Sequence, residues 1–103
     1  MMQIRARNRL LMWKSIVAAR RVCGSADNES WAWVIPLKAG NFRIRAFDVR
    51  RELLANADDL WDGNLSIVHD EFVATIDEVD DAVRRAGVDP EELDAPWKCD
   101  FPL

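Results

Sequence analysis

The stretch WAWVIPLKAGNFRIRAF, residues 31–47, decides the fold of this chain. Its first half is rich in aromatic and β-branched residues, which favour a strand, and Pro36 indicates either the end of that strand or an edge position. A Lys-Ala-Gly-Asn turn follows. The second half alternates between apolar side chains that face inward and basic ones that face outward: Phe42, Ile44 and Ala46 against Arg43 and Arg45. The stretch therefore predicts a β-hairpin.

The sequence after the hairpin predicts a helix followed by a third strand. Apolar residues recur at helical spacing from Val49 to Leu60, and Asp48 is a plausible N-cap for this helix. The Asp-Gly-Asn triplet at 62–64 ends the pattern. Residues 65–68, Leu-Ser-Ile-Val, are short and β-prone, so we expect a strand there.

The clearest helix signal lies in the second half of the chain. Five apolar residues follow a rhythm of four and three: Phe72, Ile76, Val79, Val83 and Ala86. Either Asp70 or Thr75 caps this helix, and Thr75 with Glu78 fits the capping-box pattern. Gly87 is expected to end the helix.

The two ends of the chain carry weaker signals. Residues 89–92 predict a one-turn helix, because Asp precedes Pro there, and residues 95–103 predict an extended tail with large apolar groups. Residues 10–21 fit one helical face, although residues 16–17 suit a strand equally well. Residues 1–11 are a possible flexible extension of a domain that begins at Met12.

These elements predict an α+β fold. With 103 residues, half of them apolar, the chain has the size of one domain with a thin hydrophobic core. We expect residues 12–103 to form that single domain, with a small antiparallel sheet of about three strands and two to three packed helices.

The charges of the chain are divided between its two halves. Residues 1–56 carry 11 Lys or Arg and 4 Asp or Glu, a net charge of +7, whereas residues 57–103 carry 3 and 14, a net charge of −11. Together they give the net charge of −4. An acidic lobe repels nucleic acid and attracts basic partners, so this charge map favours a protein-binding role.

The charges of the two predicted helices differ in their relation to the helix dipole. The later helix has acids in its first part and arginines in its last turn, which complements the dipole. The helix expected near Val49 has Arg50 and Arg51 in its first turn and Asp58 and Asp59 near its end. This reversed order has no evident local compensation, and such positions are candidates for function.

The reversed charges lead to a predicted protein-binding site. Three carboxylates surround an aromatic residue at a predicted turn, which resembles the anatomy of a binding hot spot. Two further acids follow closely in sequence. The predicted site is Asp58, Asp59, Trp61, Asp62, Asp70 and Glu71. The alternative is that Trp61 belongs to the core and the aspartates are merely solvated.

The basic residues of the first half have two interpretations. Four arginines could form one strip: Arg43, Arg45, Arg50 and Arg51. Such a strip could bind RNA or phosphate, which would make the chain a small nucleic-acid-associated protein. The simpler interpretation is that these arginines pair with acids of the same molecule.

The residue inventory argues against catalysis, metal binding and a resident cofactor. His69 is the only histidine and has no nucleophile in a recognised motif with it, so we expect no enzymatic activity. Cys23 and Cys99 do not make a zinc set. A disulfide between them and two reduced thiols both stay open, the latter being typical of a cytoplasmic protein. Lys14, Arg20 and Arg21 interrupt the apolar stretch near the start, so we expect no membrane span.

The chain resembles bacterial immunity proteins that accompany polymorphic toxins, including those of contact-dependent growth inhibition systems. The resemblance is one of overall style over residues 13–103: a short, acidic, Trp-rich α+β domain, the segment VDPEELDAP at 88–96 and the closing Phe-Pro-Leu. It implies a cognate toxin domain as partner, often a basic nuclease. The implied mechanism is occlusion of the toxin in a heterodimer. The basic first half departs from a uniformly acidic immunity protein.

Overall fold

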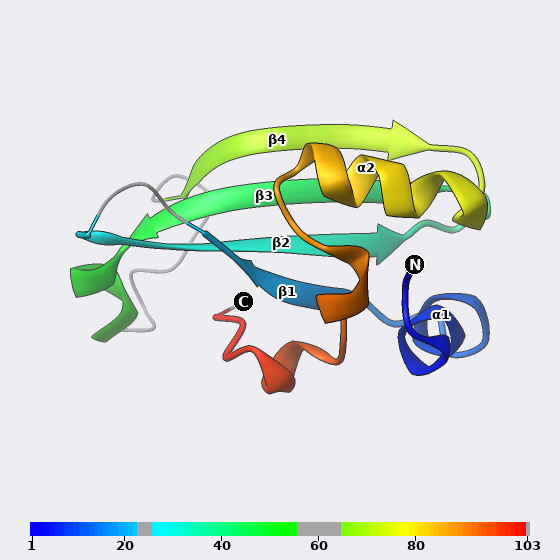
Figure 1. Ribbon diagram of the computed structural model, residues 1–103, viewed down its shortest axis with the longest axis horizontal. Coiled ribbons are helices and arrows are strands. Elements are labelled where there is room, and N and C mark those ends of the chain that lie inside the picture. Colours follow the sequence, from blue (N-terminus) through cyan, green and yellow to red (C-terminus); the bar gives the residue numbers. More distant parts are fainter. Residues whose placement is uncertain (23–25, 56–64, 103) are drawn as a thin grey trace.

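The computed structural model describes residues 1–22, 26–55 and 65–102. It contains a four-stranded antiparallel sheet in the order β1-β2-β3-β4, together with α-helices and short 3-10 helices (Figure 1). In chain order these are α1 (Ile4–Leu11), β1 (Val17–Arg21), β2 (Asn28–Pro36), β3 (Phe42–Arg50), η1 (Arg51–Ala55), β4 (Ser66–Val73), η4 (Ile76–Glu78), α2 (Val79–Arg85), η5 (Pro90–Glu92) and η6 (Pro96–Lys98). The α+β class is confirmed, but the sheet has four strands and not about three, because β1 occupies residues that fit a helical pattern.

The predicted hairpin forms the centre of the sheet. β2 and β3 pair over their whole length, with Ala32 opposite Ala46. Pro36 is the last residue of β2, as the sequence allowed. The turn is closed by Leu37 N–H, which donates to the Asn41 carbonyl oxygen at 2.9 Å. Gly40 has a φ of 87°, a conformation that strongly favours glycine over residues with a Cβ.

One face of the sheet packs against both α-helices, and α2 lies along the sheet in Figure 1. The inward-facing Ile44 and Ala46 of β3 are fully buried there, as the alternation predicts. Ala6 and Leu10 of α1 are also fully buried in this core. This packed helix, Ile4–Leu11, lies within residues 1–11, for which the sequence suggested a possible flexible extension.

The opposite face carries a smaller core. Trp31, Phe47 and Val49 are buried on it, and Phe101 from the C-terminal segment packs against them. The ring centroids of Phe47 and Phe101 are 5.8 Å apart. Each large apolar side chain buried in this way contributes about 1.5–3 kcal/mol relative to exposure. Phe101 therefore belongs to the fold, and Pro96–Lys98 of the predicted extended tail form the short helix η6 instead.

The predicted helix from Val49 is wrong at its start. β3 continues to Arg50, with Val49 opposite Glu29 of β2, so Asp48 lies inside a strand and is not an N-cap. Of the residues predicted to be helical, the described ones after β3 form only the short 3-10 helix η1 (Arg51–Ala55). The sheet pairing extends beyond the hairpin and overrides the local helical spacing. The remainder of the predicted helix, residues 56–64, lies outside the described part of the chain.

The third predicted strand is present but longer, and the helix after it is shorter than predicted. β4 runs through Phe72 and Val73, so neither residue is helical. Thr75 and Glu78 form the predicted capping box, in which the Glu78 carboxylate accepts from Thr75 N–H at 3.1 Å. Gly87, with a φ of 90°, follows the end of α2 as expected. The predicted one-turn helix is confirmed as η5, capped by Asp89.

The two edges of the sheet differ. At the β1 edge, Ala18 and Asp94 exchange backbone hydrogen bonds of 2.9 and 3.1 Å, so the C-terminal segment covers this edge. At the other edge, β4 has β3 as its one neighbour among the described strands. Cys99 is a free, half-buried thiol, and burial raises its pKa, whereas Cys23 lies outside the described residues. No helix in the described ranges has the length and apolar character needed to cross a membrane.

Candidate functional site

An acidic pocket lies between the open edge strand β4 and the following η4 and α2. Its volume is about 480 Å³. Four carboxylates, one arginine and one aromatic ring contribute to its lining. We call it the acidic pocket, and its lining residues are Glu71, Phe72, Val73, Ala74, Asp77, Glu78, Asp81 and Arg85. Carboxylates around an exposed aromatic ring suit contact with a basic, partly apolar protein surface.

The sharp connection between β4 and α2 creates this pocket. β4 ends at Val73, and the capping box at Thr75 and Glu78 fixes the start of the helical segment. The Glu78 carboxylate also accepts from Ala74 N–H at 2.8 Å. As a result, the acids of the first helical turns lie beside the last residues of β4.

Phe72 is the exposed apolar element of the pocket. It is 59% exposed, although the sequence pattern placed it on the buried side of a helix. The Arg43 guanidinium lies over its ring, 5.0 Å from the centroid, which fixes the ring by a cation–π contact. An exposed, held aromatic ring loses little side-chain entropy when a partner covers it.

Asp70 and Glu71, two residues of the predicted binding site, are neighbours on β4. Each forms an ion pair with a different element: Asp70 with β3 and Glu71 with α2. Asp70 accepts two hydrogen bonds from Arg43, at 2.8 and 2.6 Å, and these lower its pKa. Glu71 pairs with Arg85 of α2, and this hydrogen bond lowers the pKa of Glu71. His69 Nε2 lies 2.9 Å from the Glu71 carboxylate. Both predicted acids therefore already have basic partners within the molecule.

Two other acids of this region, Asp77 and Glu78, form no ion pair among the described residues, whereas Asp81 pairs with Arg84 at 2.9 Å. The Glu78 carboxylate accepts hydrogen bonds from the backbone N–H groups of Ala74 and Thr75. The sequence attributed these acids to helix capping. Their convergence on Glu71 and Phe72 depends on the fold of the β4–α2 connection, and no local signal could have shown it. The other predicted residues, Asp58, Asp59, Trp61 and Asp62, lie outside the described part of the chain.

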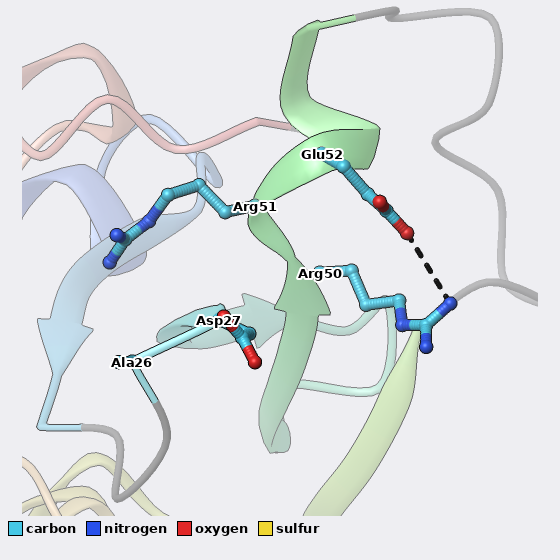
Figure 2. Close-up of a pocket in the computed structure, with 5 residues that line it drawn as sticks. All are labelled: Ala26, Asp27, Arg50, Arg51 and Glu52. Carbon is cyan, nitrogen blue, oxygen red and sulfur yellow. Dashed lines mark ion pairs between the residues drawn. The ribbon is translucent and has the colours of Figure 1, made fainter.

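A second, smaller pocket lies where β3 ends (Figure 2). It has a volume of about 380 Å³ and is lined by Ala26, Asp27, Arg50, Arg51 and Glu52. Arg50 and Glu52 form an ion pair at 3.3 Å, drawn as the dashed line in Figure 2. Arg51 points away from this pair in the same view and pairs with Glu29 at 3.1 Å. Both arginines of this pocket are thus neutralised locally.

The predicted basic strip is divided in the structure. Arg43 and Arg45 both approach Asp70, the latter at 3.7 Å. Arg43 and Arg50 are seven residues apart on one strand, and therefore about 23 Å apart. All four arginines of the strip have intramolecular carboxylate partners. The pairing interpretation is confirmed, and the arginines do not form one continuous basic surface.

The open edge of β4 lies next to the acidic pocket and adds a second mode of contact. Ile67 and Val68 are exposed on this strand, as is Phe72. An uncovered edge strand offers unpaired backbone N–H and C=O groups to another strand. Such an edge can accept a partner strand by β-augmentation while neighbouring side chains select the partner.

Comparisons with protein-family models, with curated proteins and with solved structures find no match. The fold and the site still define a physical class. Within the described residues the chain is a small α+β protein in which β4 has a neighbour on one side only, and beside β4 lie an exposed aromatic ring and two carboxylates without an ion-pair partner, Asp77 and Glu78. These features are typical of a protein-binding surface.

Proposed function

We propose that this chain is a non-enzymatic immunity protein that neutralises a cognate toxin by binding it and occluding its active surface. The observation that carries the proposal is the acidic pocket with exposed Phe72 beside the open edge of β4. The partner is a basic toxin domain, of which a nuclease is the expected kind. The complex is a cytoplasmic heterodimer.

Charge complementarity supports a basic partner. Asp77 and Glu78 are exposed and form no ion pair with Lys or Arg among the described residues, whereas Asp81 already pairs with Arg84 at 2.9 Å. A partner's Lys and Arg residues can therefore pair with Asp77 and Glu78. Such complementarity increases the association rate, which can reach about 10⁸–10⁹ M⁻¹s⁻¹ at low salt. Salt weakens it, because exposed charges are screened over about 10 Å at 0.1 M.

The proposed toxin-binding residues include those selected from the sequence and those that line the acidic pocket in the structure. Asp70 and Glu71 lie on β4, and we retain Asp58, Asp59, Trp61 and Asp62 from the sequence as further members of the surface. Phe72, Asp77 and Asp81 join them through the pocket. A toxin held here would contact a rigid strand and a capped helix, which favours a preorganised complex.

Intramolecular pairing of the basic strip argues against the nucleic-acid alternative. A polyanion would have to displace Asp70, Glu29 and Glu52 from their arginines, and it would meet the net negative charge of the chain. We therefore expect no RNA binding even at about 50 mM salt, where electrostatic affinity is high. Binding of RNA that is lost in Arg50→Gln and Arg51→Gln variants would favour the alternative.

The decisive test uses the variable C-terminal domain of the large secreted protein that we expect the neighbouring upstream gene to encode. Its affinity is measured for wild type and for Phe72→Ala and Asp77→Ala, with Lys38→Ala as an exposed control. We expect the two pocket variants to bind about tenfold or more weakly, and the control to bind as wild type does. Equal affinity of all variants would exclude the pocket as the contact surface.

A second set of variants tests the part of the surface proposed from sequence. Asp58→Ala, Asp59→Ala and Asp62→Ala should each weaken toxin affinity and protection of the cell, because each removes one carboxylate from a charged interface. Wild-type affinity and protection in all three would remove this segment from the toxin-binding surface and leave the pocket on β4 as the site.

A further inference from the structure

A second exposed groove lies far from β4 in sequence, between helix α1 and the C-terminal turn η6. Its volume is about 310 Å³ and its lining is mostly apolar. We call it the Trp groove, and its lining residues are Arg5, Asn8, Arg9, Met12, Trp13, Asp94, Ala95, Trp97 and Lys98. None of these residues belongs to the acidic pocket, so the groove is independent of the proposed toxin-binding surface.

One stripe of α1 and the turn that follows it forms one wall. Residues 5, 8, 9, 12 and 13 follow the spacing of a single helical face, while Ala6 and Leu10 on another face are buried in the core. Trp97 of η6 forms the opposite wall. Trp13 and Trp97 are 66% and 68% exposed, and Met12 is also exposed. A small protein that leaves two tryptophans and a methionine uncovered in one concave place presents a binding surface.

The polar groups of the groove are almost all donors. The Arg9 guanidinium lies over the Trp97 ring, 5.0 Å from its centroid, and Arg9 Nε–H donates to the Ile16 carbonyl oxygen at 3.2 Å. Neither Arg9 nor Lys98 has a carboxylate partner in the described ranges. The one acid of the lining, Asp94, is already paired with Arg5 at 2.7 Å. The groove therefore combines an apolar floor with an uncompensated positive rim.

We propose that the Trp groove binds an acidic peptide segment of a partner protein, which inserts a large apolar side chain between flanking carboxylates. The apolar side chain would fill the space between Trp13 and Trp97, and the carboxylates would reach Arg9 and Lys98. This gives the protein a second interaction surface, whose partner is opposite in charge to the basic toxin. Charge complementarity selects that partner, and the aromatic anchors supply most of the affinity.

A peptide fits the surroundings of the groove better than single-stranded nucleic acid does. Aromatic rings and cations also suit stacked bases. However, Glu91 and Glu92 are exposed just before Asp94 in the chain, and a long polyanion would run into their charge. A short peptide segment can confine its carboxylates to the positive rim. Its affinity would still fall with salt.

The test is an ¹H–¹⁵N titration of the full chain with a capped octapeptide that has a central Leu-Phe pair flanked by Asp and Glu. We expect saturable shifts of the Trp13 and Trp97 indole N–H signals below about 1 mM peptide. Trp97→Ala and Lys98→Glu should each weaken binding about tenfold or more. Both side chains are exposed, so these variants are expected to fold.

Two matched controls and two further ligands complete the test. Lys38→Glu makes the same charge change at the distant hairpin turn, and Phe72→Ala removes an exposed aromatic from the acidic pocket. Both should bind the peptide as wild type does. The proposal is overturned if the peptide gives no saturable shifts, if a version with Lys in place of its acids binds equally, or if an eight-nucleotide oligo(U) RNA binds more tightly. Because toxin binding is not measured, this result is separate from the test of the immunity function.

Discussion

The two edges of the sheet differ in whether another segment of the chain covers them. The β1 edge is covered by the C-terminal segment, which bonds Ala18 to Asp94, and Trp31 Nε1–H donates to the Cys99 carbonyl oxygen at 2.9 Å. The β4 edge has no such cover among the described residues and exposes Phe72. Uncovered edges promote association, and proteins usually protect them. We infer from this contrast that the covered edge serves stability, and we propose that the β4 edge serves binding.

The largest expected loss of stability comes from removing Trp31, the β2 side chain that holds the C-terminal segment in place. Trp31 is buried and links β2 to the C-terminal segment. Trp31→Ala leaves a cavity and an unpaired carbonyl, so we expect the free energy of unfolding to fall by about 3–5 kcal/mol. The matched variant at the open edge, Phe72→Ala, should cost about 1 kcal/mol or less. Urea denaturation measures both, and similar losses in the two variants would remove the contrast between the edges.

The closing segment itself should show the next largest effect. Leu93 is fully buried just before the Asp94 bridge, so Leu93→Ala should lower the free energy of unfolding by about 2–4 kcal/mol. Val68→Ala, which shortens an exposed side chain of β4, is the control and should change stability by about 0.5 kcal/mol or less. If the two variants unfold at the same urea concentration, the C-terminal segment does not stabilise the β1 edge.

The ion pair on β4 should have the smallest effect, and that effect should depend on pH. Arg43→Gln should lower the free energy of unfolding by about 1 kcal/mol or less at pH 7, because the pair is partly exposed. Arg43 holds the pKa of Asp70 below its ordinary value of 3.8. The stabilisation is therefore complete above that value and is lost as the pH falls through the lowered pKa.

Stability curves of wild type and Arg43→Gln should thus converge in acid. Arg50→Gln is a suitable control, since its pair with Glu52 is highly exposed. A difference between wild type and Arg43→Gln that stays constant down to about pH 2 would show that Arg43 acts through its packing on Phe72 and not through Asp70.

The hairpin and the local caps could be predicted from sequence because their causes are local. Alternation in residues 42–47, Pro36 at the strand end, and the capping box of Thr75 and Glu78 depend on near neighbours in the chain. β1 could not be separated from a helix, because Val17 fits both periods and its strand forms only against β2. The pairing of β1 with β2, which is distant in sequence, therefore determines that these residues form a strand.

The candidate site was predictable only in part. Asp70 and Glu71 were selected as acids close to the cluster at 58–62, but their arginine partners come from β3 and α2. Phe72 fitted the helical rhythm and became an exposed strand residue instead. The Trp groove had no sequence signal, because Trp13 and Trp97 meet only through the packing of α1 against the C-terminal segment.

The most direct test of the central claim is amide hydrogen exchange with and without the toxin domain. We expect toxin to slow exchange in β4 and in residues 74–81, because partner contacts would cover the β4 edge and the acidic pocket. Exchange in β1, whose edge is already covered, should not change. Slowed exchange at β1 or α1, with β4 as fast as in the free protein, would contradict the claim that the open edge is the binding surface.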